Sequence, residues 1–175
     1  MIRAQKSAVV ERWFRIWNRR FLAKSFHRVH LDGSPDMLPC KEGIPLIVCT
    51  SHSSWWDLLL GVHLMEILPQ WDSYAPMDQR QLERYRFFSK LGVIGVDRSN
   101  LAGAREFSDY AHELLSYPDK ALWITAQGEF ASTALRPVKF QPGAGAIAGS
   151  LPRFYASTAV FDYEFWSEKK PEAFI

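Results

Sequence analysis

The sequence predicts an α/β domain in which helices flank a mostly parallel sheet. Short apolar runs alternate along the chain with longer segments of helical periodicity. The connections between them are short, and in alternating chains this favours parallel strands joined by helices. With 175 residues, the chain has the length of one domain with a single hydrophobic core.

The individual elements follow from these patterns. A helix is expected at residues 9–26, followed by a Gly/Pro/Asp-rich stretch at 32–43. A short continuous apolar run, typical of a strand buried in a parallel sheet, occupies 44–50. Further strands are predicted at 73–77, 92–96 and 121–125, and a long fifth strand at 155–166. Helical patterns lie between them, at about 57–68, 79–90, 101–116 and 144–150. Residues 169–175 are expected to form a turn and a further strand, which suggests a domain that lacks its C-terminal part.

The first helix is amphipathic. Its apolar side chains recur at three- and four-residue spacing, and arginines occupy most of the remaining surface. Tryptophan and phenylalanine surrounded by arginines are typical of a helix lying in a bilayer interface. A helix that docks on its own domain gives the same pattern, and both roles can hold together. The residues expected to contact a membrane are Arg12, Trp13, Phe14, Trp17, Arg19 and Phe21.

Charge is distributed unevenly along the chain. Residues 1–30 contain eight basic side chains and one acidic side chain, a net charge of +7, whereas the remainder has 13 basic and 18 acidic side chains, a net charge of −5. Such asymmetry points to a polyanionic partner, either nucleic acid or an anionic membrane. Nucleic acid is disfavoured because the basic side chains are confined to one amphipathic helix and the remainder is acidic.

Neither a membrane-spanning segment nor an export signal is expected. No window holds about 18 consecutive apolar residues, and the N-terminus has no uninterrupted apolar core. Cys40 and Cys49 form neither a metal-binding pattern nor a disulfide scaffold, so they are interpreted as packing thiols in a reducing compartment. Together with the first helix, these features suggest a peripheral protein on the cytoplasmic face of the cell membrane.

His52 and Asp57 are the candidate catalytic pair. Five steps along a helix would place them on different faces, so they meet only if His52 lies in the loop after the first strand and Asp57 in the first helical turn. Ser51, Ser53 or Ser54 can cap such a helix. The carboxylate would then fix the tautomer of the imidazole, and the second ring nitrogen would remain free as a base for an alcohol. Trp55 and Trp56 are expected to shield the pair from water.

A second polar group follows the strand at 92–96. Arg98 offers a guanidinium fork for an anionic head group, and Asp97 precedes it. A surface ion pair is the competing interpretation of these two residues. No metal site is predicted, because His27 and His30 lack a carboxylate or cysteine cluster to complete one and are expected to be ordinary polar residues after the helix.

Four segments, in chain order, carry a family resemblance. They are Thr50 to Asp57, Gly92 to Arg98, Trp123 to Gly128 and Phe140 to Gly143. This order resembles the glycerolipid acyltransferases, the lysophospholipid (1-acylglycerol-3-phosphate) acyltransferases with a His-x-x-x-x-Asp motif. The resemblance covers about residues 44–166 and implies an acyltransferase domain at 31–175. It agrees with the membrane-interface helix at 1–30, which the residue pattern predicts without it.

The resemblance implies acyl transfer from acyl-CoA or acyl carrier protein, as co-substrate, to a lipid hydroxyl, with no other cofactor. His52 would deprotonate the acceptor, Asp57 would orient the imidazole, and Arg98 would hold a phosphate. The third segment departs from the family pattern, because Gln127 replaces a Glu and Phe130 stands where an Arg is usual. Arg136 or Lys139 would then replace the missing Arg. The implied substrate-binding residues are Asp97, Arg98, Gln127, Gly128 and Arg136.

The acceptor therefore stays open. Lysophosphatidate is favoured, and a non-phosphate acceptor such as a glycolipid, an ornithine lipid or a glycosylated terpenoid is the alternative. A non-catalytic module that binds anionic membranes through the first helix is a further hypothesis of a different class.

Overall fold

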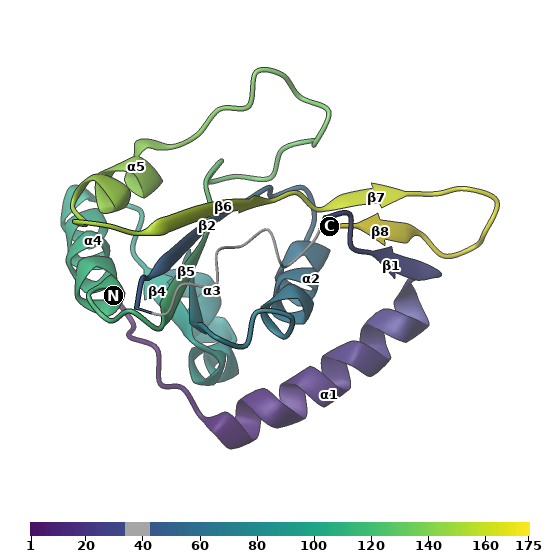
Figure 1. The fold of residues 1–175 in the computed structure, drawn as a ribbon, viewed down its shortest axis with the longest axis horizontal. Coiled ribbons are helices and arrows are strands. Elements are labelled where there is room, and N and C mark those ends of the chain that lie inside the picture. The colour runs from purple at the N-terminus through teal and green to yellow at the C-terminus, as the bar shows by residue number, and fades with distance from the viewer. Residues whose placement is uncertain (34–42) are drawn as a thin grey trace.

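The computed structural model describes residues 1–33 and 43–175. A five-stranded sheet of order β4-β3-β5-β2-β6 lies at its centre (Figure 1). Every neighbouring pair in this sheet is parallel, so the α/β fold with a parallel sheet is confirmed. The strands are β2 (Leu46–Thr50), β3 (Asp72–Asp78), β4 (Val93–Val96), β5 (Lys120–Thr125) and β6 (Tyr155–Ala159).

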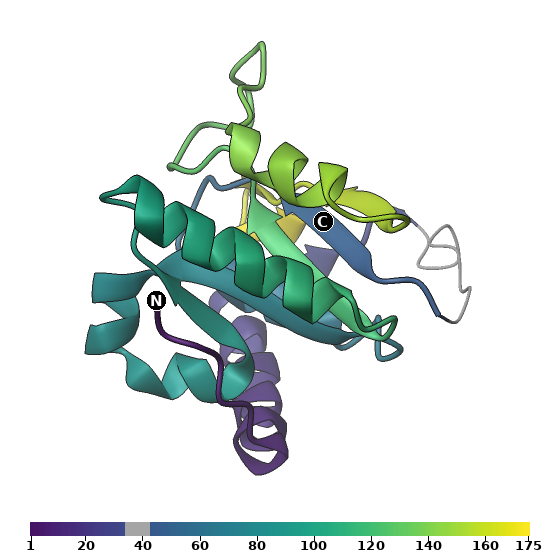
Figure 2. The same ribbon diagram turned by 90° about the vertical axis from the view of Figure 1, so that its left-hand side faces the viewer.

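Helices cover both faces of the sheet. Figure 2 shows α4 (Leu101–Leu115) and α5 (Pro142–Gly149) on one side and α1 (Ala8–Ser25) on the other. The face covered by α1 is shared with α2 (Trp56–Met65), and buried leucines of the two helices join one hydrophobic cluster. Side chains along β2 point alternately to the two faces of the sheet, and each face has its own hydrophobic cluster. Leu46 and Val48 face α1 and α2, whereas Ile47 faces α4 and α5.

Two predicted elements are divided in the structure. The helix expected at 79–90 is an α-helix, α3 (Gln79–Arg84), followed by a 3-10 helix, η2 (Arg86–Leu91), with Tyr85 between them at φ −122° and ψ 56°. In η2, the carbonyls of Ser89 and Lys90 accept hydrogen bonds from the backbone of residues 5 and 7, and this ties down the N-terminal segment. The strand expected at 155–166 ends at Ala159 and resumes elsewhere.

The second part of the strand predicted at 155–166 is β7 (Asp162–Glu164), which belongs to a separate three-stranded sheet of order β1-β8-β7. The expected C-terminal strand is confirmed as β8 (Glu172–Phe174), whereas β1 (Arg28–His30) was not predicted. His30 is thus a strand residue: its Nε2 lies 2.7 Å from Glu172 Oε2 and its ring stacks on Phe174. The small sheet therefore joins the chain after α1 to the C-terminal strand.

The remaining predictions concern the cysteines and the chain segment before β2. Cys40 and most of the Gly/Pro/Asp-rich stretch lie outside the described residues. Cys49 is a free, partly buried thiol on β2, and burial raises its pKa. A raised pKa makes a thiol less reactive, which agrees with a packing role.

Candidate active site

The candidate residues gather at one edge of the large sheet. Parallel strands all end at the same edge, and this is where open α/β sheets build their sites. His52 follows β2, Arg98 follows β4, Gln127 follows β5 and Asp162 follows β6. Segments far apart in the sequence therefore converge there because of the sheet topology.

His52 and Asp57 form a hydrogen-bonded pair, as expected. The Nδ1 atom of His52 donates to Asp57 Oδ2 over 3.1 Å, with His52 in the loop after β2 and Asp57 in the first turn of α2. The same carboxylate oxygen accepts from the backbone N–H groups of Ser53 at 2.7 Å and Ser54 at 3.0 Å. Ser54 Oγ accepts in turn from the N–H of Trp56. The helix start thus holds the carboxylate.

The second nitrogen of the imidazole remains available. Within residues 1–33 and 43–175, no hydrogen bond involves Nε2 of His52, and the side chain is 26% exposed. Because a carboxylate can only accept, Nδ1 carries the proton and Nε2 carries the lone pair. The pair can therefore take a proton from a ligand hydroxyl at Nε2.

Phe130, rather than the two tryptophans, packs on the imidazole. Its ring lies 4.0 Å from that of His52, measured between centroids, with an angle of 26° between the planes. Trp55 and Trp56 stack on each other, and Trp56 packs against Phe26 in the core. The ring that packs on His52 is therefore Phe130 and not one of the two tryptophans expected to shield the pair from water. Phe130 thus contacts the candidate base directly.

The other oxygen of Asp57 is bound by a residue that the sequence did not single out. The hydroxyl of Tyr163, on β7, donates to Asp57 Oδ1. Asp57 is only 4% exposed, so this is a hydrogen bond to a buried charge. Burial and the adjacent carboxylate both raise the pKa of Tyr163. The phenol therefore stays protonated and acts as a donor.

Gln127 and the loop that follows it form hydrogen bonds with the backbone N–H and carbonyl of His52. Gln127 Oε1 accepts from the His52 N–H over 3.0 Å, and the N–H of Ala131 donates to the carbonyl of His52 over 2.8 Å. The structure thus gives Gln127 a contact within the protein that orients His52, in addition to the substrate role expected from the resemblance.

Arg98 lies against Gly128. A Cβ atom built on Gly128 would be 3.3 Å from Arg98 Nη2 and 2.9 Å from Gln141 Cγ, and Gly128 has φ +75°. A residue with a side chain would be strained there and would displace its neighbours. Arg98 is exposed and makes no ion pair or hydrogen bond with the described residues, so its guanidinium is available to an anion.

Asp97 and Arg136 are engaged within their own loops. Asp97 accepts from the N–H and hydroxyl of Ser99 and from Asn100 Nδ2, and these hydrogen bonds lower its pKa. It orders the start of α4. Arg136 Nη1 donates to the carbonyls of Thr133 at 2.6 Å and Leu135 at 2.9 Å. Only Nη1 of Arg136 is engaged in this way, so the exposed Arg136 and Lys139 both stay candidates for the contact that the missing Arg would make.

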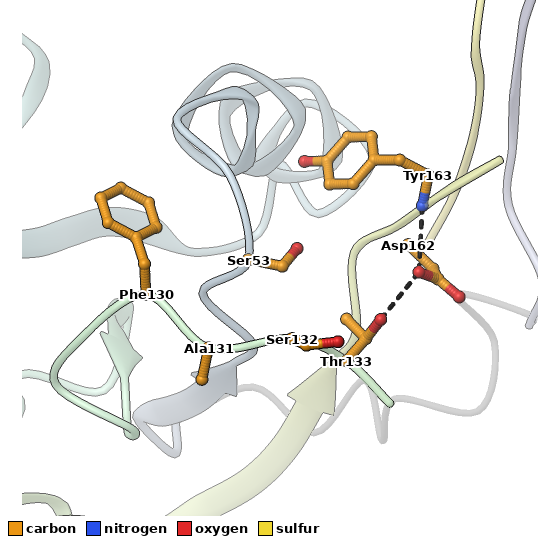
Figure 3. A pocket seen from close by; sticks show the side chains of 7 residues that line it. All are labelled: Ser53, Phe130, Ala131, Ser132, Thr133, Asp162 and Tyr163. Atoms are coloured by element: carbon orange, nitrogen blue, oxygen red, sulfur yellow. Dashed lines mark hydrogen bonds between the residues drawn. The ribbon is translucent and has the colours of Figure 1, made fainter. Parts of the chain in front are cut away.

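A cleft of about 450 Å³ opens next to Ser53, the residue that follows His52. Figure 3 shows the side chains that line it. One carboxylate oxygen of Asp162 accepts from Thr133 Oγ1 at 2.8 Å and from the N–H of Tyr163 at 3.1 Å, whereas Oδ2 has no hydrogen bond among the described residues. The described lining contains hydroxyl groups and one carboxylate but no basic side chain. Its residues are Ser53, Phe130, Ala131, Ser132, Thr133, Asp162 and Tyr163.

The apolar face of α1 is divided between the core and the surface. Phe14 and Phe21 are partly buried against the core, and Arg19 pairs with Glu66, the residue directly after α2, so these three are used within the protein. Trp13 is 70% exposed and Trp17 47%, and Arg12 is exposed. We call the exposed apolar residues Val9, Trp13, Ile16 and Trp17 the α1 stripe. Among the described helices, none is long and apolar enough to cross a membrane.

The described residues also include no group of three or more His, Cys, Asp or Glu side chains arranged to hold a metal ion. No protein-family model matches the chain, and no curated protein matches it in sequence.

Proposed function

We propose that the protein is an O-acyltransferase that moves a fatty acyl group from acyl-CoA or acyl carrier protein to a hydroxyl of a lipid acceptor. The observation that carries the proposal is the His52–Asp57 pair, which lies at the carboxyl edge of a parallel sheet and leaves Nε2 without a partner among the described residues. An open cleft is lined by the neighbouring residues Ser53, Phe130 and Tyr163. The α1 stripe, with Arg12 next to it, supports a peripheral position on the cytoplasmic face of a membrane, where lipid acceptors are found.

In the proposed reaction, Nε2 of His52 takes the proton of the acceptor hydroxyl as its oxygen attacks the thioester carbonyl carbon. The imidazolium is stabilised by Asp57, which accepts from Nδ1. When the carbon–sulfur bond breaks, the leaving thiolate takes this proton from Nε2. The protein atoms are unchanged after one turnover, and no covalent acyl-enzyme is needed.

Two acceptor classes fit different observations. Arg98 is free beside Gly128 and supports an acceptor with a phosphate, of which 1-acylglycerol-3-phosphate is the first candidate. A neutral hydroxylated acceptor, such as a glycolipid, is favoured by the cleft lining, where Asp162 Oδ2 would repel a phosphate and accept from a hydroxyl.

The test is acyl transfer by the purified protein with labelled acyl-CoA and labelled acyl carrier protein. Each donor is combined with 1-acylglycerol-3-phosphate, with a neutral lyso-glycolipid, or with no acceptor, and the lipid products are identified. We expect a labelled lipid in at least one acceptor arm. Thioester consumption at the same rate without acceptor indicates a hydrolase, and vesicle binding without any turnover indicates a non-catalytic membrane-binding module.

A further inference from the structure

We infer that Tyr163 is a positioning residue of the site: its hydroxyl holds the Asp57 carboxylate in the orientation that directs Oδ2 to His52. This inference rests on the proposed function of the His52–Asp57 pair. Tyr163 lies 106 positions from Asp57 in the sequence and reaches it from the small sheet.

The need for such a residue follows from the hydrogen bonds of Asp57. Oδ2 accepts from His52 and from the two backbone N–H groups of Ser53 and Ser54, whereas Oδ1 accepts only from Tyr163 among the described residues. The terminal torsion of an aspartate is broad, so hydrogen bonds must fix the plane of the carboxylate. Without the phenol, a charged oxygen on a residue only 4% exposed would lose its partner. The carboxylate would then turn toward another donor, or water would enter.

Tyr163 is itself held from several sides. It pairs with Ala173 on β8, its N–H donates to Asp162, and its ring stacks on Phe26 with 6.1 Å between centroids. Phe26 directly follows α1 and belongs to the main core. The small sheet thus has a function that its size alone does not suggest, because it places the Tyr163 hydroxyl against the His52–Asp57 pair.

The geometry also distinguishes positioning from simple packing. Replacing Tyr163 with Phe removes the hydroxyl and keeps the ring on Phe26, so packing is retained while the contact with Asp57 is lost. Tyr155 on β6 offers a matched control, since its hydroxyl has no hydrogen bond among the described residues and it packs on the same core. A loss that follows Tyr163→Phe but not Tyr155→Phe is therefore due to the hydroxyl.

The kinetic experiment measures kcat and KM for wild type, Tyr163→Phe, Tyr155→Phe, Asp57→Asn and the Asp57→Asn/Tyr163→Phe double variant. We expect Tyr163→Phe to lower kcat about tenfold, with KM changed less than about twofold, and to have almost no effect when Asp57 is already Asn. An equal loss in both backgrounds, or unchanged kcat in Tyr163→Phe, overturns the inference.

A second measurement needs no activity. Nitrogen NMR of the His52 ring reports which nitrogen carries the proton, and we expect the Nδ1–H tautomer to dominate in wild type and in Tyr155→Phe. In Tyr163→Phe, the population of the other tautomer rises. An unchanged tautomer in Tyr163→Phe contradicts the positioning role, even if the protein transfers no acyl group. Conversely, a tautomer shift without acyl transfer in wild type supports the positioning role and contradicts the proposed function.

Discussion

Trp13→Ala tests whether the α1 stripe binds a membrane. Trp13 is 70% exposed, more than any other tryptophan in the described chain. The substitution removes little packing within the protein, so the fold and its stability should change little. Any effect on membrane binding therefore comes from the loss of the exposed ring.

The size of the effect follows from the exposed area. A tryptophan side chain presents up to about 250 Å², so the exposed part of Trp13 is about 170 Å². Full transfer from water at about 25 cal/mol per Å² would give about 4 kcal/mol. An interfacial helix immerses only one side of its rings, so about half of this, or about 2 kcal/mol, is expected. The vesicle partition coefficient should fall about thirtyfold.

The assay is sedimentation with anionic and with neutral vesicles over a range of lipid concentrations. Leu101→Ala is the matched control, because Leu101 is 85% exposed but begins α4 on the opposite face of the sheet. We expect wild type and Leu101→Ala to bind anionic vesicles equally and Trp13→Ala to bind them much more weakly. Equal binding by all three proteins would refute the assignment of the α1 stripe to the membrane.

Three further substitutions probe the site and the fold. Asp57→Asn should lower kcat at least about a hundredfold, because an amide cannot support the imidazolium as a carboxylate does; steady-state kinetics and a circular dichroism spectrum show whether activity falls with the fold retained. Gly128→Ala should lower the free energy of unfolding by about 1–2 kcal/mol, since φ of Gly128 is +75° and the new Cβ meets Gln141. Urea denaturation measures this loss, and an unchanged midpoint contradicts the left-handed conformation of Gly128. Burial alone would raise the pKa of Asp72, but hydrogen bonds from Lys6 and Lys120 lower it overall. The charge of Asp72 therefore stabilises the folded state at pH values above the ordinary pKa of about 3.9, and this contribution is lost as the pH falls toward the folded pKa. Asp72→Asn should therefore cost up to about 1 kcal/mol at pH 7, and this cost should shrink in denaturation curves as the pH falls toward the folded pKa; a difference that does not shrink with falling pH is inconsistent with it.

The parts of the site that local sequence determines could be predicted. His52 and Asp57 are close in sequence, and a strand, a loop and a capped helix leave one arrangement in which they meet. The parallel sheet was predictable for a similar reason, because continuous apolar runs alternate with amphipathic helices. In both cases, the signal lies within short windows of the chain.

The parts that depend on distant contacts could not be predicted. Tyr163 was included in one long predicted strand, but residues 155–159 and 162–164 join different sheets. Buried Phe161 lies at the crossing between them, with its N–H bound to Ser51 Oγ. Strand propensity is the same on both sides of this crossing, so only tertiary contacts decide which sheet each part joins.

The first helix shows a different limit. An amphipathic pattern marks an apolar face but does not tell whether the face meets the protein or a bilayer. In the structure, Leu22 and the polar Asn18 are the buried positions of α1, and Asn18 Nδ2 donates to the carbonyl of Leu59. The apolar face is consequently shared, with Phe14 and Phe21 against the core and Trp13 exposed.

The central claim is that His52 is the base for acyl transfer to a lipid hydroxyl. It is tested most directly by the rate of labelled acyl transfer from thioester to acceptor lipid by wild type and by His52→Ala, each shown to be folded by circular dichroism. We predict acceptor-dependent transfer by wild type and a loss of at least about a thousandfold in His52→Ala. Transfer by His52→Ala at the wild-type rate would contradict the claim.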